Sequence, residues 1–304
     1  MRFPLKLNRS GWPRWLAKLA PVANDPRAVC GESVDETGFT EAVSAFKFGT
    51  TFKTTRKDRF LLTIRELAKL PFATLPVILD IGASDGSTSL DVMKQVAHAK
   101  YYVTDLNIEI RCQADAHAMW FYDEHGGCIL RASDRWVAYP DRIGAVFPFG
   151  WISRALFARA PDLDPDARRV ALVRPSVLVR EGDVIIRKHD VLQDWSGEKA
   201  DLIIIANVLN RVYFSDATIG EALGKLKAAL THDGRIAIID NRPGERSTIF
   251  RFPGGEAAVE TRINGGTEIE NLALATFGVD AGLSDGDVRR ADVAGAVAAK
   301  DAGS

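Results

Sequence analysis

Apolar runs that end in a polar side chain recur along the chain and set its predicted architecture. Five of them cover residues 76–80, 101–105, 184–190, 201–207 and 235–240, and each closes on an aspartate or an asparagine. Strands of a parallel sheet are buried on both faces and therefore read as near-continuous apolar runs rather than as an alternation. The pattern predicts five parallel strands whose carboxyl ends carry polar side chains.

Helical periodicity fills the spaces between these strands. Residues 219–230 carry apolar side chains at positions i, i+4, i+7 and i+11, and residues 87–96 offer a second apolar helical face. Alternating strands and helices indicate an α/β fold with a doubly wound, mostly parallel sheet. Residues 257–263 and 269–277 are expected to add two edge strands, which gives seven strands in all.

The rest of the chain reads as additions to this core. The N-terminal region is locally basic, and residues 42–70 have a helical pattern. A helix is also expected over residues 108–122, after which regularity lapses. The expected boundaries are 1–75 for a partly helical N-terminal extension, 76–283 for a nucleotide-binding domain, 126–182 for an insertion after its second strand, and 284–304 for a disordered tail.

Composition narrows the class of protein. The formal net charge is -1, from 39 basic and 40 acidic side chains, so no overall positive field favours nucleic acid as a partner. Cys30, Cys112 and Cys128 are odd in number and widely spaced, which argues against a disulfide framework and a thiolate zinc site. A reducing, cytoplasmic location fits this cysteine usage. No stretch reaches the roughly 18 apolar residues that a membrane span needs, and no residue cluster has metal-ligand spacing.

The first expected strand runs into the glycine loop Asp80-Ile81-Gly82-Ala83-Ser84-Asp85-Gly86. Glycine tolerates positive φ and lets a ligand approach bare backbone, so such a loop between a strand and a helix is typical of a site for a polar cofactor. The dinucleotide fingerprint G-x-G-x-x-G would need glycines where this chain has Ser84 and Ser87. The spacing therefore argues against a nicotinamide cofactor.

The order of these features resembles the class I, Rossmann-like S-adenosylmethionine-dependent methyltransferases. The family's loop pattern D-x-G-x-x-x-G is matched by Asp80, Gly82 and Gly86, and the resemblance extends over residues 76–275 without the insertion. It implies a seven-stranded sheet of methyltransferase type, with S-adenosylmethionine as cofactor and S-adenosylhomocysteine as product. The cofactor-binding residues that it implies are Asp80, Gly82, Ala83, Ser84, Gly86, Asp105, Asp190 and Asn207.

The resemblance also implies separate roles for the acids and the amide at the strand ends. Asp105 would bind the ribose, Asp190 would meet the adenine amine, and Asn207 would lie beside the reacting methyl group. Each has a plainer interpretation. Asp105 can cap the following helix, Asp190 can be an ordinary loop acid, and Asn207 can form a turn.

Residues 201–214 show a partial likeness to chemotaxis-receptor methyltransferases around the fourth strand. Ala206 stands where those enzymes have an arginine, and two residues are added before the Tyr213-Phe214 pair, which argues against a glutamate side chain as acceptor. The Asp-Pro-Pro-Tyr type of motif of adenine N-methylating enzymes is absent as well. We predict Asn207 and Tyr213 as catalytic residues, and Asn210, Arg211 and Arg242 as substrate-binding residues.

Aromatic residues near the N-terminus bear on the acceptor. Trp12, Trp15, Leu16 and Leu19 lie among arginines and a lysine, a composition seen in helices on anionic membranes or on partner proteins; docking on the domain itself is the alternative. We predict methylation of a small or lipid-like acceptor at oxygen or nitrogen, by in-line displacement without a metal, with possible peripheral membrane contact through residues 1–24. The alternatives are a protein methyltransferase and a cofactor-binding scaffold without turnover.

Overall fold

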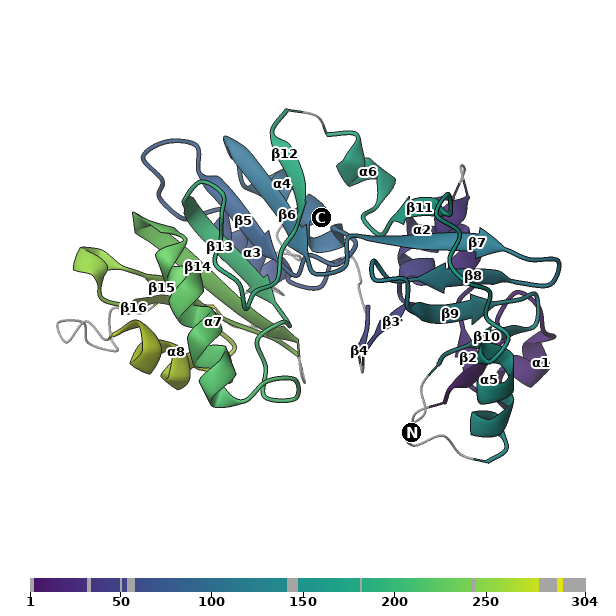
Figure 1. Ribbon diagram of the computed structural model, residues 1–304. Coiled ribbons are helices and arrows are strands. Elements are labelled where there is room, and N and C mark those ends of the chain that lie inside the picture. Colours follow the sequence, from purple (N-terminus) through teal and green to yellow (C-terminus); the bar gives the residue numbers. More distant parts are fainter. Residues whose placement is uncertain are drawn as a thin grey trace, which may run out of the picture. The chain divides into compact units, whose positions relative to one another are not determined.

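The chain folds as two compact units, each built from two separate stretches of sequence (Figure 1). The computed structural model describes residues 3–31, 34–49, 51–53, 58–140, 147–180, 182–241 and 244–278, together with the backbone of a strand at 289–291. Unit 1 comprises Met1–Thr55 and Asn107–Ser176, and unit 2 comprises Arg56–Leu106 and Val177–Ser304. The chain therefore enters each unit twice.

A seven-stranded mixed sheet forms the framework of unit 1. Its order is β11-β7-β8-β9-β10-β1-β2, and its strands are β1 (Leu5–Asn8), β2 (Val22–Ala23), β7 (Glu109–Ala114), β8 (Met119–Tyr122), β9 (Cys128–Ala132), β10 (Trp136–Ala138) and β11 (Arg168–Ala171). The other elements are the hairpin β3 (Lys47–Phe48) and β4 (Thr51–Phe52), the helices α1 (Arg14–Ala17), α2 (Glu36–Val43) and α5 (Phe149–Phe157), and the 3-10 helix η1 (Pro26–Cys30). The two stretches of chain join in one sheet because β1 pairs with both β2 and β10.

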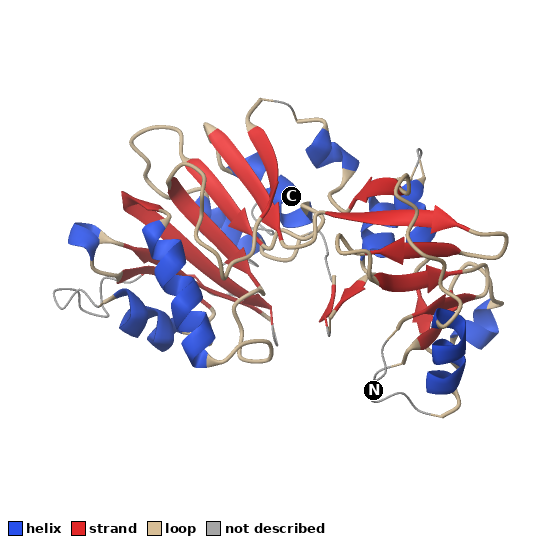
Figure 2. Cartoon of the chain, in the orientation of Figure 1, coloured by secondary structure: helices blue, strands red, loops and turns tan. Residues whose placement is uncertain are grey.

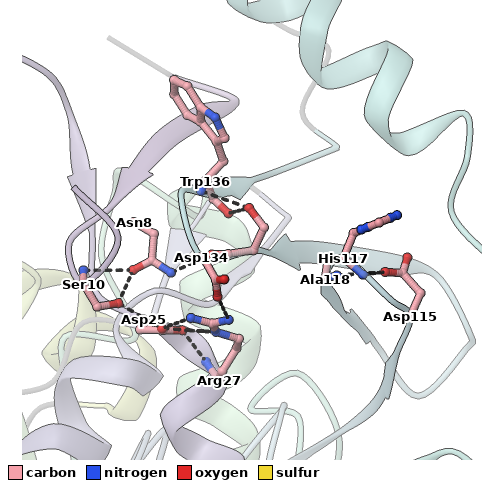
Figure 3. Close-up of polar contacts among 10 residues, drawn as sticks. Asn8, Ser10, Asp25, Arg27, Asp115, His117, Ala118, Asp134 and Trp136 are labelled. Carbon is pink, nitrogen blue, oxygen red and sulfur yellow. Dashed lines mark hydrogen bonds and ion pairs between the residues drawn. The ribbon is translucent and has the colours of Figure 1, made fainter.

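Polar contacts fasten the N-terminal strand to the turn between β9 and β10 (Figure 3). The buried Asn8 side chain donates to the carbonyl oxygen of Ser133 over 2.8 Å. Arg27 bridges Asp25 and Asp134, with N···O distances of 2.6 Å to each carboxylate. These bonds make the N-terminal residues an integral part of unit 1.

The expected helix over residues 108–122 is wrong, since this stretch forms β7 and β8. Ile110 and Cys112 are buried while the residues next to them are partly or fully exposed, and a period of two suits a strand rather than a helix. The Asp115 carboxylate then accepts hydrogen bonds from the backbone N–H groups two and three residues later, over 2.6 and 2.8 Å (Figure 3). This side-chain bond closes the turn between the two strands.

An eight-stranded sheet forms the framework of unit 2. Its order is β12-β6-β5-β13-β14-β15-β16-β17, and its strands are β5 (Val77–Ile81), β6 (Lys100–Asp105), β12 (Val184–Lys188), β13 (Ala200–Ala206), β14 (Leu230–Asn241), β15 (Glu245–Arg251), β16 (Ala258–Ile263) and β17 (Arg289–Ala291). The first five in this order are parallel, β15 is antiparallel to both neighbours, and β17 is parallel to β16. The five parallel strands predicted from the apolar runs are confirmed.

Helices cover both faces of this sheet (Figure 2). One face carries α3 (Leu61–Leu67) and α4 (Ser87–Gln95), and the other carries α7 (Asp216–Ala228) and α8 (Glu270–Phe277). A short 3-10 helix, η2 (Pro253–Gly255), follows β15, and α6 (Pro175–Leu178) lies where the chain passes from unit 1 to unit 2. On the α7 face, a buried apolar cluster joins Leu79, Ile203 and Ile238 of the sheet to Leu223 and Leu226 of the helix.

The N-terminus of α3 is capped by a side chain from the sheet. Phe60, which precedes the helix, offers no side-chain hydrogen bond. Glu245 on β15 takes this role: Oε2 accepts from the N–H of Leu62 over 3.2 Å and Oε1 from the N–H of Thr63 over 2.6 Å. A carboxylate in this position also meets the positive end of the helix dipole.

Three expectations about secondary structure in these regions need correction. The sheet has eight strands rather than seven, because β15 forms a hairpin with β14 and β17 adds an edge. Residues 269–277 contain helix α8 instead of a strand, and its buried residues Ala273 and Phe277 lie one helical turn apart. Of residues 42–70, the second half forms the expected helix as α3, whereas the first half contains the hairpin of β3 and β4, with Gly49, whose φ is 56°, directly after β3.

The compact units also depart from the expected boundaries. The segment after the second strand belongs to unit 1 from Asn107 to Ser176, and the N-terminal stretch of that unit ends at Thr55. The expected extension, 1–75, and insertion, 126–182, therefore contribute most of one folded unit, held together by the pairing of β1 with β10. Of the expected tail, β17 is the part among the described residues. No helix in the described ranges is long and apolar enough to cross a membrane.

Candidate functional site

The strand order of unit 2 reverses beside β5. From β5 the chain adds β6 and then β12 on one side, and it returns to add β13 and β14 on the other. In open α/β sheets, ligands bind outside the carboxyl ends of the strands at such a switch point. Residues 82–86, which follow β5, and Asn207, which follows β13, both lie at this edge.

Three of the five residues between β5 and α4 have a left-handed backbone. Gly82, Ser84 and Gly86 have φ values of 69°, 59° and 81°, which glycine adopts without strain and serine does not. The N–H of Ala83 donates to the carbonyl oxygen of Thr104 over 2.8 Å, so the end of β6 holds the loop. The loop is a preformed turn at the switch point.

Gly82 lies against the residue that follows Asn207. A Cβ atom at Gly82 would come within 2.3 Å of Val208 Cγ2, so the valine side chain would have to move. The sequence suggests one reason for a glycine at this position, namely that the expected cofactor approaches the backbone closely. The structure adds a second reason, because a protein side chain already occupies the space that a Cβ atom would need.

Asp105 ends β6 beside the loop, where the resemblance places the ribose-binding acid. Its Oδ2 accepts from the backbone N–H of Ser84 over 2.9 Å. Its carbonyl oxygen accepts from the N–H of His189 over 3.1 Å, which ties the end of β12 to the end of β6. The structure therefore brings the predicted acid and the predicted loop together.

The Asp80 carboxylate bonds to interior groups of unit 2. The residue is 2% exposed, and Oδ2 accepts from Ser89 Oγ on α4 over 2.7 Å and from the Tyr101 hydroxyl over 2.9 Å. Burial raises the pKa of Asp80 to about 6, although these two hydrogen bonds act in the opposite direction. We interpret Asp80 as a residue that positions α4 and the loop, while a direct contact with the cofactor stays a prediction.

Asp190 and Asn207 each make a local hydrogen bond at their strand ends. Asp190 Oδ1 accepts from the N–H of Leu192 over 2.9 Å, a local bond that its plainer interpretation as a loop acid also allows. Asn207 has a φ of 56°, and its Oδ1 accepts from the N–H of Asn241 over 2.9 Å. Asn207 thus joins the ends of β13 and β14, and cofactor binding by either residue stays a prediction.

The predicted substrate-binding residues are partly committed to other contacts. Arg211 Nε donates to Asp216 Oδ1 over 2.8 Å, and its Nη1 donates to the carbonyl oxygen of Glu268 over 3.1 Å. Asn210 Nδ2 donates to the carbonyl oxygen of Asn207 over 3.3 Å. The predicted catalytic Tyr213 is 38% exposed, in the same turn. Arg242 lies outside the described residues.

The loop before α8 contacts the carboxyl end of β14 and was not predicted from the sequence. Asp240 Oδ2 accepts from Thr267 Oγ1 and, over 3.0 Å, from the N–H of Glu268. Thr267 and Glu268 lie 27 and 28 residues after Asp240 in the chain, so no local pattern signals these contacts. In the described parts of the chain, no group of three or more His, Cys, Asp or Glu side chains is arranged to hold a metal ion.

Comparison with known proteins yields matches among solved structures. No family model and no curated protein matches the chain. Mitomycin 7-O-methyltransferase MmcR is 15% identical over 59% of this chain and 36% of its own, with a TM-score of 0.31. Human N-acetylserotonin methyltransferase in complex with SAM is 13% identical over 59% of this chain and 34% of its own, with a TM-score of 0.29. A pericyclic reaction enzyme is 13% identical over 67% and 36%, with a TM-score of 0.33.

These matches span about a third of the length of each matched protein. TM-scores of this size do not establish a shared fold. The chain's own strand order, loop geometry and sequence pattern carry the functional proposal.

Proposed function

We propose that unit 2 binds S-adenosylmethionine at the carboxyl edge of its sheet and transfers the methyl group to a small or lipid-like acceptor at oxygen or nitrogen. One observation carries the proposal: at the switch point beside β5, the left-handed loop 82–86 and the Asp105 carboxylate are joined by a 2.9 Å hydrogen bond. This juxtaposition matches the order of motifs by which the sequence resembles class I methyltransferases.

The groups at this edge fit the cofactor. The Asp105 carboxylate is an anionic acceptor suited to the two hydroxyl groups of a ribose, and the glycines beside it allow a ligand to approach the backbone. Four non-glycine residues in the described parts of the chain have positive φ, and two of them, Ser84 and Asn207, lie here. Strained backbone of this kind concentrates at ligand sites, which supports a binding role for this edge.

The chemistry asks little of the chain beyond positioning. When bound, S-adenosylmethionine supplies an electrophilic methyl group on a sulfonium, and the chain has to hold the acceptor in line with it. We assign this orienting role to Asn207 and the exposed Tyr213. A protonated acceptor also needs a base. Burial lowers the pKa of His189, which favours the neutral imidazole that can take a proton.

Exposed aromatic side chains on unit 1 support an apolar acceptor or contact with a lipid surface. Trp15 and Leu19 are 65% and 77% exposed, and Phe147 and Trp151 are 86% and 68% exposed. The buried side chain of α5 is the polar Ser153, so the apolar residues of this helix are left at least partly accessible. We propose these side chains as contacts to an apolar acceptor or a lipid surface; a protein acceptor and a scaffold without turnover are the alternatives.

Transfer of a labelled methyl group into fractionated cell extract tests the proposed function. We expect label in the small-molecule or lipid fraction, and we expect Asp105→Ala to abolish it. Label confined to protein would favour the protein methyltransferase, and no label in any fraction, despite cofactor binding, would favour the scaffold. Asp194→Ala serves as a matched control, since this acid of unit 2 has an 89% exposed side chain.

Sedimentation with anionic phosphatidylserine vesicles tests the membrane contact separately. We expect the full chain to co-sediment and the paired variant Trp15→Ser, Leu19→Ser to lose most of this binding, because the two side chains are exposed and leave the core intact. Equal sedimentation of both proteins, or of neither, would contradict a membrane role for residues 1–24.

A further inference from the structure

Two cysteines that are far apart in the sequence meet in unit 1. Cys30 ends η1 and Cys112 lies in β7, 82 residues later, yet their Sγ atoms are 3.5 Å apart. Met119 Sδ lies 3.6 Å from Cys30 Sγ, so three sulfur atoms cluster here. The spacing of cysteines argues against disulfides when the sequence is considered alone, and the fold changes that conclusion for this pair.

The two thiols differ in access and in their surroundings. Cys112 is 4% exposed, whereas Cys30 is only partly buried, so an external reagent reaches Cys30 first. The hydrogen bond between the two thiols lowers the pKa of Cys112 and raises the pKa of Cys30, and the positive charge of Arg168 lowers the pKa of Cys112 further. Arg168 is the cross-strand partner of Cys112 in the β11–β7 pairing. A thiolate is the nucleophile in disulfide exchange, so this environment activates Cys112.

We propose that Cys30 and Cys112 form a reversible disulfide by exchange with a small-molecule disulfide such as glutathione disulfide. The bond would join η1 to β7 inside unit 1. Closing the Sγ···Sγ separation from 3.5 Å to a bond of about 2.0 Å requires a shift of the order of a side-chain rotation. The proposal concerns unit 1 and is independent of methyl transfer by unit 2.

The exchange balances in two steps. Cys30, the thiol that an external reagent reaches first, loses its proton to solvent as its Sγ attacks one sulfur of glutathione disulfide, which forms a mixed disulfide and releases one glutathione thiolate. The Cys112 thiolate then attacks Cys30 Sγ, forms the Cys30–Cys112 bond and releases the second glutathione thiolate. The protein loses two thiol protons and two electrons, and glutathione disulfide is reduced to two molecules of glutathione.

Thiol counting on the full chain in glutathione redox buffers tests this proposal. After oxidation we expect two of the three thiols to resist alkylation, a peptide pair linked through Cys30 and Cys112 after digestion with trypsin and Glu-C, which cuts at Glu124 between Cys112 and Cys128, and full recovery of thiols with dithiothreitol. The link closes a long loop, so the melting temperature of unit 1 should rise by about 4 °C or more. Cys128→Ser should behave like the unaltered chain, because Cys128 Sγ has its contact 3.9 Å away, at the carbonyl oxygen of Leu130.

Single variants separate the two steps. Cys112→Ser should stop at a stable glutathione adduct on Cys30, and Cys30→Ser should remain unmodified at Cys112. The proposal is overturned if the unaltered chain keeps three alkylatable thiols in oxidising buffer, if a glutathione adduct on Cys30 persists without resolving, or if the cross-link involves Cys128. These readouts on the unaltered chain hold even if a serine variant fails to fold.

Discussion

Substituting alanine for Gly82 adds one methyl group at the crowded edge beside β5. The new Cβ atom would meet Val208 Cγ2 at 2.3 Å, and the backbone φ of 69° disfavours any side chain. The left-handed conformation costs about 1 to 2 kcal/mol for a residue with a Cβ atom, and overpacking costs about 1 to 3 kcal/mol. We expect unit 2 to lose about 2 to 5 kcal/mol of unfolding free energy.

Gly254 provides a matched control for the backbone cost. Its φ is 65°, close to that of Gly82, but a Cβ atom there would have nothing within 4 Å. Gly254→Ala should therefore show the conformational cost alone, about 1 to 2 kcal/mol. The difference between the two alanine variants isolates the contact with Val208.

Amide hydrogen exchange of β5 and β13 measures these costs within unit 2, with β8 of unit 1 as internal reference. Each 1.4 kcal/mol lost speeds exchange about tenfold. Adding Val208→Ala to Gly82→Ala should recover about 1 to 3 kcal/mol, because the obstructing Cγ atoms are removed. If the two substitutions are additive, or if Gly82→Ala costs no more than Gly254→Ala, the close approach of the two loops is refuted.

Three further predictions concern side chains that each stabilise one of the two units. Glu245→Ala should destabilise α3 by about 1 to 2 kcal/mol, measured by hydrogen exchange. Glu245→Gln should cost less, because the glutamine side chain keeps an acceptor for the helix N–H groups, and an equal loss in both variants would contradict capping by Glu245. Burial raises the pKa of Asp80 from 3.8 to about 6, so the contribution of its protonated carboxyl group to folding stability is present below pH 4 and is lost as pH rises through 6. Relative to Asp80→Asn, the unfolding free energy of the unaltered chain should therefore fall by up to about 3 kcal/mol between pH 4 and pH 8. A difference that does not change with pH would contradict this. Asn8→Ala should cost unit 1 about 1 to 3 kcal/mol in urea denaturation, because it removes the donor to the partly buried carbonyl oxygen of Ser133. A neutral effect would show that the bond is not made.

The core of unit 2 was predictable because its physical cause is local. A parallel strand buried on both faces needs a continuous apolar run, and residues 76–80 and 201–207 are runs of this kind. Helix α7 was likewise visible from its spacing. The antiparallel edge was harder: residues 269–277 are apolar and short, and such a run suits a strand or a buried helix equally.

Unit 1 was missed because its defining contacts are long-range. The pairing of β1 with β10 joins residues more than 120 positions apart, and no local pattern signals it. The same limit applies to the site. The loop residues and Asp105 follow strands that can be identified from the sequence, whereas the neighbour of Gly82, the cap Glu245 and the pair of Cys30 with Cys112 depend on which surfaces the fold brings together.

Isothermal titration calorimetry of the full chain with S-adenosylmethionine and S-adenosylhomocysteine tests the central claim most directly. We predict one site in unit 2 with micromolar affinity for both ligands. Asp105→Asn should weaken binding by about ten- to a hundredfold, through loss of a charged hydrogen bond, and Asp194→Asn should leave it unchanged. No heat from either ligand at millimolar concentration, with the protein folded, would contradict the account.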